Sequence, residues 1–366
     1  MSFTALDHEH MARAIQLAAR GLYTTDPNPR VGCVIVKNGQ VIGEGWHVRA
    51  GEAHAEIHAL QQAGEQAQAA TAYVSLEPCC HHGKTPPCSD ALIAAQVARV
   101  VVAMQDPNPR VAGNGMRQLQ AAGIQVELGL LEAQAKALNP GFIQRMQMRR
   151  PYVRNKLAMS LDGRTAMADG ESKWITGDAA RQDVQRLRAR SSAIMTGVGT
   201  VLADDPALTV RLADTERQPL RVIIDSNLST PLTARLLKEP GETLIMTVNS
   251  DPDLQASLRD AGAEVVQIGN AGQDVDLKLV LANLAERNIN EVLLETGATL
   301  SGAMLEAQLI NEMVFYMAPL LMGDAARGLY RLPQLQQMAD RIELDIQDVR
   351  PVGKDLRITA TPIYKV

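Results

Sequence analysis

Apolar residues recur along the chain at two spacings, one typical of helices and the other typical of strands. Residues 8–20 repeat apolar side chains at helical spacing. Two apolar runs, 31–36 and 41–47, flank Asn38-Gly39, a strong hairpin signal. Helices predicted at 54–64, 88–96 and 114–122 then alternate with strands predicted at 72–76, 98–104 and 124–128. This alternation predicts a layered α/β domain.

The alternation breaks between residues 140 and 151, a basic segment bounded by prolines, so we place a domain boundary near residue 145. A second pattern then begins with a strand at 152–160 and a helix at 178–190. Further strands are predicted at 192–197, 221–226, 243–248, 263–268, 291–295 and 312–318, followed by an antiparallel hairpin of 342–349 with 356–364. The sequence therefore predicts two α/β domains, residues 1–145 and 146–366.

Composition narrows the class of protein. The 366 residues are 46% hydrophobic and 21% charged, and this length favours two domains over a single core. The net charge of −5 is not the basic footprint of a nucleic-acid-binding protein. The sequence contains neither a membrane-length apolar run of ~18 residues nor a secretory signal pattern. We therefore expect a cytoplasmic protein with no nucleic-acid or membrane partner.

Histidine and cysteine are confined to the first part of the chain. All seven His and all four Cys fall within the first 88 residues, at positions 8, 10, 47, 54, 58, 81 and 82 for His and 33, 79, 80 and 88 for Cys. Thiolate and imidazole chemistry is therefore excluded from the remainder. If that remainder is catalytic, it needs other side chains or a borrowed cofactor.

A candidate metal site stands within this part of the chain. His54 is followed by Glu56, and two cysteines, Cys79 and Cys88, come later with eight residues between them. Three protein ligands leave zinc a fourth position for water, and Glu56 could reach that water without being a ligand. Zinc deaminases carry a related H-x-E…P-C-x-x-C pattern in which the Glu transfers protons, although their cysteines are closer together. The pattern favours hydrolytic deamination of an aminated heterocycle.

A structural zinc is the alternative. Cys80, His81 or His82 could supply a fourth ligand and close the site, but Glu56 would then have no role. Among the other histidines, His58 is expected beside the ligands rather than on the metal, whereas His47 could line the pocket or pack beside Trp46.

Local features of the second domain leave two interpretations open. A strand at 291–295 runs into a turn with two glycines, Gly297 and Gly302, that opens a helix. Such a turn can bind phosphate through free backbone N–H groups, or it can be an ordinary strand-to-helix connection. The hexapeptide DPNPRV, present at 26–31 and 106–111, is likewise either good turn chemistry used twice or a pair of loops that rim one pocket.

Motifs in both halves of the chain resemble those of one family. The first half contains TTDPNPRVGCVIV, HAEIHAL and EPCCHHGKTPPCSDAL, and the second half contains, in this order, KLAMSLDGRTA, GESKWIT, TGVGTVLADDPALTVR, VIIDS and ETGATLSGAML. The first set resembles the deaminase half, and the second set the reductase half, of the bifunctional deaminase/reductases of riboflavin biosynthesis. The resemblance runs from about residue 8 to about residue 360. It implies a cytidine-deaminase-like three-layer α/β/α domain followed by a dihydrofolate-reductase-like α/β domain.

The resemblance also implies site residues and a substrate. In the first domain it implies zinc on His54, Cys79 and Cys88, Glu56 as the proton shuttle, and Asn28 as a substrate contact. The substrate would be a phosphorylated diaminopyrimidinone that loses its ring 2-amino group and then has its ribosyl chain reduced to ribityl by NADPH. NADPH contacts would be Ala158, Trp174, Thr200, Asp204, Ser226, Gly297, Ala298, Thr299, Leu300, Ser301, Gly302 and Ala303. Substrate contacts in the second domain would be Ser172, Arg188, Leu208, Arg211 and Glu295, with the two arginines as phosphate clamps.

Two rival functions make different predictions. A zinc deaminase of nucleosides or tRNA with a non-catalytic C-terminal domain would release ammonia from cytidine and oxidise no NADPH. A non-enzymatic, zinc-stapled nucleotide-binding protein would place four protein ligands on the metal. A homo-oligomer is a further expectation that the family resemblance carries.

Overall fold

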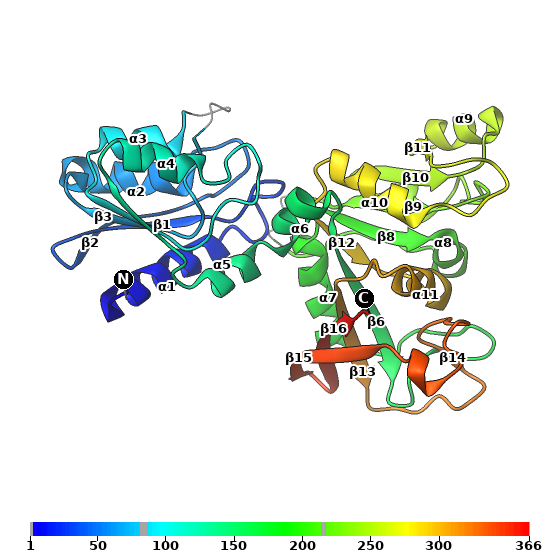
Figure 1. Ribbon diagram of the computed structural model, residues 1–366. Coiled ribbons are helices and arrows are strands. Elements are labelled where there is room, and N and C mark those ends of the chain that lie inside the picture. Colours follow the sequence, from blue (N-terminus) through cyan, green and yellow to red (C-terminus); the bar gives the residue numbers. More distant parts are fainter. Residues whose placement is uncertain (1–2, 81–85, 214, 216, 366) are drawn as a thin grey trace. The chain divides into compact units, whose positions relative to one another are not determined.

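The computed structural model describes residues 3–80, 86–213, 215 and 217–365 (Figure 1). The chain divides into two compact units, one ending at Arg150 and the other beginning at Pro151. The predicted boundary near 145 instead falls inside helix α6 (Pro140–Met148). Pro140 occupies the first turn of this helix, where its missing N–H costs nothing, so it begins a helix rather than marking a linker.

The first unit is built on a five-stranded mixed sheet. Its strand order is β2-β1-β3-β4-β5, with antiparallel pairing from β2 to β3 and parallel pairing from β3 to β5. The strands are β1 (Gly32–Lys37), β2 (Gln40–Trp46), β3 (Thr71–Val74), β4 (Arg99–Val102) and β5 (Gln125–Leu128). The helices are α1 (Ala5–Ala19), α2 (Ala55–Ala63), α3 (Cys88–Ala94), α4 (Asn114–Ala121), α5 (Glu132–Leu138) and α6, with a 3₁₀ turn η1 (Gly64–Ala67).

Alternate residues of each strand feed two separate cores. Cys33 and Ile35 of β1 pack with the alanines of α2 and with Leu92 and Leu119 of α3 and α4. Val34 and Val36 point to the other face, where α1 and α5 cover them. The first unit is therefore the predicted three-layer α/β/α domain.

The second unit is built on a nine-stranded sheet. Its order is β11-β10-β9-β8-β12-β6-β13-β16-β15, parallel from β11 to β13 and antiparallel from β13 to β15. The strands are β6 (Tyr152–Ser160), β8 (Ala193–Gly197), β9 (Leu220–Ile224), β10 (Thr243–Thr247), β11 (Glu264–Gln267), β12 (Glu291–Leu294), β13 (Glu312–Ala318), β15 (Glu343–Val352) and β16 (Asp355–Ile363). A separate two-stranded ribbon joins β7 (Arg164–Ala166) to β14 (Arg327–Gly328).

Helices cover both faces of this sheet. Helices α10 (Leu277–Glu286) and α11 (Ala298–Glu306) pack on one face, and α7 (Asp178–Arg190), α8 (Val198–Asp204) and α9 (Pro252–Asp260) pack on the other. Short 3₁₀ turns lie at η2 (Arg235–Leu237) and η3 (Met338–Asp340). This is the predicted second α/β domain. Within the described residues, no helix is both long and apolar enough to cross a membrane.

Candidate active sites

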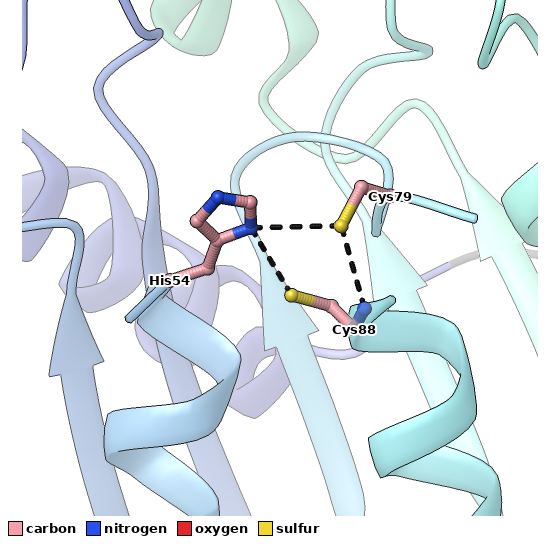
Figure 2. Close-up of side chains that lie close together, drawn as sticks. All are labelled: His54, Cys79 and Cys88. Atoms are coloured by element: carbon pink, nitrogen blue, oxygen red, sulfur yellow. Dashed lines mark hydrogen bonds between the residues drawn. The ribbon is translucent and has the colours of Figure 1, made fainter. Parts of the chain in front are cut away.

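Three predicted metal ligands from separate elements meet at one point in the first unit. His54 immediately precedes α2, Cys79 follows β3, and Cys88 is the first residue of α3 (Figure 2). His54 Nδ1 lies 3.3 Å from Cys88 Sγ and 3.5 Å from Cys79 Sγ. A tetrahedral zinc ion, with bonds of about 2.1 Å to nitrogen and 2.3 Å to sulfur, needs N···S separations of roughly 3.6 Å. The cluster therefore fits zinc in both donor chemistry and spacing.

Two glycines of β2 fix the position of α2, and with it His54. A Cβ added at Gly45 would lie 2.2 Å from the carbonyl oxygen of Ala55, and one at Gly43 would lie 2.2 Å from that of Ala59. Any side chain at these positions would push the helix off the sheet. The two glycines therefore allow the first turn of α2, which carries His54 and Glu56, to approach the cysteines.

The electrostatics of the cluster favour a thiolate on Cys79. The Cys88 side chain and His54 donate hydrogen bonds to Cys79 Sγ and, against the effect of burial, hold the pKa of this thiol well below its usual range. The backbone N–H of Cys88 also donates to this sulfur, at 3.4 Å. Zinc binds cysteine as the thiolate, so the site holds Cys79 in the form that a metal requires.

Glu56 is buried next to the ligands. Burial raises the pKa of its carboxyl to about 7, and the nearby Cys79 thiolate adds to the effect. One carboxylate oxygen, Oε2, has no hydrogen-bond partner among the described residues. A buried carboxyl with an unused oxygen beside three metal ligands is poised to exchange protons with a water on the metal. A structural site would leave this oxygen unexplained.

The fourth ligand required by a structural zinc is not found among the described residues. The group of possible ligands there consists of His54, Cys79 and Cys88, without Cys80. His81 and His82, the other residues of that alternative, lie outside the described part of the chain.

The two DPNPRV loops contact the site region differently. In the first, Asn28 Nδ2 lies 3.1 Å from Nε2 of His47, whose ring stands edge-on to His54 with centroids 5.1 Å apart. In the second, the backbone N–H of Asp106 donates to Glu77, two residues before Cys79. The first loop therefore lies beside the metal site, whereas the second is anchored to the segment that carries a ligand.

In the second unit, the predicted NADPH contacts gather at the carboxyl ends of neighbouring parallel strands. Ala158 lies near the end of β6, and Ser226 follows β9. Thr200 and Asp204 lie on α8 after β8, and residues 297–303 begin α11 after β12. The Thr296 hydroxyl accepts a hydrogen bond from the N–H of Gly197, which ties these two connections together. Open parallel sheets bind ligands at this edge.

Two of the predicted NADPH contacts, Gly302 and Ser301, pack against or bond to other parts of the protein. A Cβ at Gly302 would lie 2.1 Å from the carbonyl oxygen of Arg331, so this glycine permits a close packing contact. The Ser301 hydroxyl is fully buried and accepts from the Asn155 side chain at 3.3 Å. In contrast, Trp174 is 71% exposed and lies under the guanidinium of Arg181.

The predicted substrate residues Arg188 and Glu295 are bound to each other. Arg188 donates to both carboxylate oxygens of Glu295, at 2.6 and 3.1 Å, and to the carbonyl of Thr209 at 3.0 Å. Lys156 Nζ lies 3.7 Å from the same carboxylate. Although burial opposes it, the charges of Arg188 and Lys156 lower the pKa of Glu295 to about 2. Sequence reasoning did not identify Lys156, whose only signal is a charge in a largely buried strand.

Of the two predicted phosphate clamps, Arg211 is the more accessible. It is exposed, and burial together with the charges of Arg188 and Arg235 lowers its pKa. Such an excess of positive charge favours a phosphate. Leu208 is buried, so it would contact a substrate mainly through its backbone. Lys173 Nζ lies 3.8 Å from Asp204, which links the loop of Ser172 and Trp174 to α8.

Known families match both units. Residues 4–104 match the cytidine and deoxycytidylate deaminase zinc-binding region. Residues 151–358 match the RibD C-terminal domain, a reductase domain. Fold and sites therefore define a zinc-binding deaminase joined to a reductase.

Full-length relatives identify the family. Riboflavin biosynthesis protein RibD of Escherichia coli strain K12 is 50% identical over 363 residues, covering 96% of this chain and 98% of that protein. Acinetobacter baumannii RibD superimposes with a TM-score of 0.92 at 50% identity, covering 98% of this chain and 99% of that one. A Thermotoga maritima diaminohydroxyphosphoribosylaminopyrimidine deaminase/5-amino-6-(5-phosphoribosylamino)uracil reductase superimposes with a TM-score of 0.86 at 34% identity, with 98% and 99% covered. The chain belongs to the RibD family and is a bifunctional enzyme of the deamination and reduction steps of riboflavin biosynthesis.

Proposed function

We propose that the first unit deaminates a diaminohydroxyphosphoribosylaminopyrimidine at a zinc ion held by His54, Cys79 and Cys88. The observation that carries this proposal is the buried carboxyl of Glu56, with one unpartnered oxygen beside the three ligands. When bound, zinc acts as a Lewis acid that lowers the pKa of water toward ~7. Glu56 accepts a proton from the attacking water and delivers it to the departing ammonia. Asn28, beside His47, holds the pyrimidine ring.

In the second unit, we propose that NADPH reduces the ribosyl chain of the deaminated product. When bound, NADPH supplies a hydride, so this unit needs neither histidine nor cysteine. Its proposed site is the edge where β9, β8, β12 and β6 end, near the beginnings of α8 and α11. The ionised Glu295 and its cationic partners Arg188 and Lys156 offer both donors and acceptors to sugar hydroxyls, and Arg211 offers a cation to the phosphate.

A coupled assay tests both halves of this proposal. The diaminopyrimidinone nucleotide and NADPH are supplied to zinc-loaded enzyme, and ammonia and NADP⁺ are measured separately. We expect one ammonia per substrate, followed by NADPH oxidation; chelation of zinc should abolish the first signal. Reduction of pre-deaminated substrate should survive chelation. Ammonia release from cytidine, with no NADPH oxidation on any aminopyrimidine nucleotide, would instead support the nucleoside deaminase.

We also propose a homo-oligomer, with a second copy of the chain covering an exposed apolar face of β15. Leu344, Ile346 and Val349 pair with Pro362, Ala360 and Ile358, which are alternate residues of β16, so all three point to one face. That face continues the core, because Ile358 packs against it, yet Ile346 is 60% exposed. A two-fold partner would bring Glu343 of one β15 toward Arg350 of the other.

Replacing Ile346 with lysine should therefore produce a monomer. A charge at the centre of a buried apolar contact is costly to desolvate, so we expect a halved mass in light scattering at micromolar concentration. Leu254→Lys, at an exposed apolar position on α9, is the matched control and should keep the oligomer. A wild-type mass equal to one chain would refute the oligomer itself.

A further inference from the structure

His47 is buried beside the metal ligands without being one of them. Its Nδ1 lies 3.2 Å from the carbonyl oxygen of Ala53, and its Nε2 lies 3.1 Å from the side-chain amide nitrogen of Asn28. We infer that His47 is a positioning residue that fixes the Asn28 amide with its oxygen toward the substrate. This arrangement would make the deaminase selective for rings with an N–H next to the amino-bearing carbon. The inference rests on the proposed deaminase function.

The tautomer of His47 follows from its two neighbours. A carbonyl oxygen can only accept a hydrogen bond, so the Nδ1 that faces Ala53 carries the proton. The ring is buried, and burial favours the neutral form of an imidazole. In a neutral ring protonated at Nδ1, Nε2 is an acceptor without a hydrogen.

This acceptor determines which way the Asn28 amide points. Only the NH₂ group of Asn28 can satisfy Nε2, because its amide oxygen would face a lone pair. Rotating the amide would thus lose one hydrogen bond and create a repulsion. In the part of the chain that the structure describes, the side-chain hydrogen bond of Asn28 is made by its amide nitrogen, and none is made by Oδ1. The backbone N–H of Asn28, bonded to the carbonyl of Thr25 at 2.8 Å, helps to hold the residue in place.

An oriented acceptor distinguishes two kinds of aminopyrimidine. In a 2-aminopyrimidin-4-one, the amino-bearing carbon lies between a bare ring nitrogen and a ring N–H. In cytosine, it lies between a bare ring nitrogen and a C–H. An oxygen at Asn28 can accept from the N–H of the first ring, whereas it gains nothing from the C–H of the second. A polar site left unpaired by the wrong ligand is the strongest basis of discrimination between close analogues.

The test compares isocytosine, which has this N–H, with cytosine as inhibitors of ammonia release. We expect wild-type enzyme to bind isocytosine about tenfold more tightly, the value of one well-placed hydrogen bond. His47→Phe keeps a ring but leaves the amide free to turn, so the ratio of inhibition constants should fall toward one. His47→Gln can again accept from Asn28 and should restore most of the ratio.

Further variants keep the result interpretable. His10→Phe makes the same change at a buried histidine of α1, on the other side of the sheet, and should preserve the ratio. Asn28→Ala removes the acceptor without altering His47, so it must lower the ratio even if His47→Phe fails to fold. A His47→Phe enzyme with normal zinc content, reduced turnover and an unchanged ratio would overturn the inference. Wild-type enzyme that releases no ammonia from the pyrimidinone nucleotide would instead refute the proposed function.

Discussion

Glu56→Gln enzyme is expected to deaminate its pyrimidine substrate about 10²–10⁴-fold more slowly than wild type, the usual contribution of a general acid–base group. Glutamine has the same size and can still accept a hydrogen bond, but it cannot take a proton from water and pass it to ammonia. Reduction of the already deaminated nucleotide should continue at the wild-type rate. The residues proposed for that step all lie between 156 and 303, in the other unit.

The measurement uses the full chain and follows ammonia release and NADP⁺ formation with two substrates, the diaminopyrimidinone nucleotide and its deaminated product. Glu65→Gln, at an exposed position just after α2, is the matched control and should leave both rates unchanged. Zinc content is determined for each variant, because Glu56 is proposed to act beside the metal rather than on it. A folded, zinc-loaded Glu56→Gln enzyme that lost both activities would contradict two independent sites.

Elements with their own periodic pattern could be predicted from the sequence, whereas elements specified by capping and packing could not. The strands of both sheets were predicted because each is a short apolar run or an alternating apolar and polar stretch between turn signals. Helices α9 and α10 were not predicted, although Asp251 and Asp276 accept hydrogen bonds from the first backbone N–H groups of these helices. The ribbon of β7 and β14 joins segments about 160 residues apart, and nothing local specifies it.

The sites likewise contain residues that a local sequence pattern identifies and residues that only contacts in the folded protein identify. The zinc ligands follow a compact motif, so their meeting could be predicted without the structure. The Asn28–His47 pair and the Lys156–Glu295–Arg188 cluster depend on through-space contacts between distant segments, which no spacing encodes. The sequence left His47 between pocket lining and packing beside Trp46; the structure places its ring against His54. For Arg188, the family resemblance implies a phosphate clamp, and in the structure its guanidinium pairs with Glu295.

Arg154→Leu is expected to lower the free energy of unfolding of the second unit by about 3–5 kcal/mol. Arg154 is fully buried on β6 and donates to Glu312 of β13 at 2.5 Å and to Glu291 of β12 at 3.0 Å. Removing the cation leaves two carboxylates in the sheet, with Arg190, 3.3 Å from Glu291, as a remaining cation near both. Urea unfolding, with hydrogen exchange of β6 and β13, should show a loss confined to this unit.

Arg235→Leu provides the control, because Arg235 pairs with Glu239 at an exposed position away from β15, and its loss should cost at most about 1 kcal/mol. Equal losses in the two variants would refute a special role for the buried network.

The pH dependence of stability distinguishes the loss of a charge interaction from a packing defect. In wild type, Arg154 lowers the pKa of Glu312 against the effect of burial. The ion pair therefore stabilises the folded state, and this stabilisation is lost as the pH falls through the folded-state pKa of Glu312. In Arg154→Leu, burial without this cation should raise the pKa of Glu312, so that Glu312 becomes neutral on acidification and the cost of burying its charge is relieved. The difference in free energy of unfolding between wild type and Arg154→Leu should therefore become smaller as the pH falls from about 7 to about 4, whereas a simple packing defect would keep this difference constant.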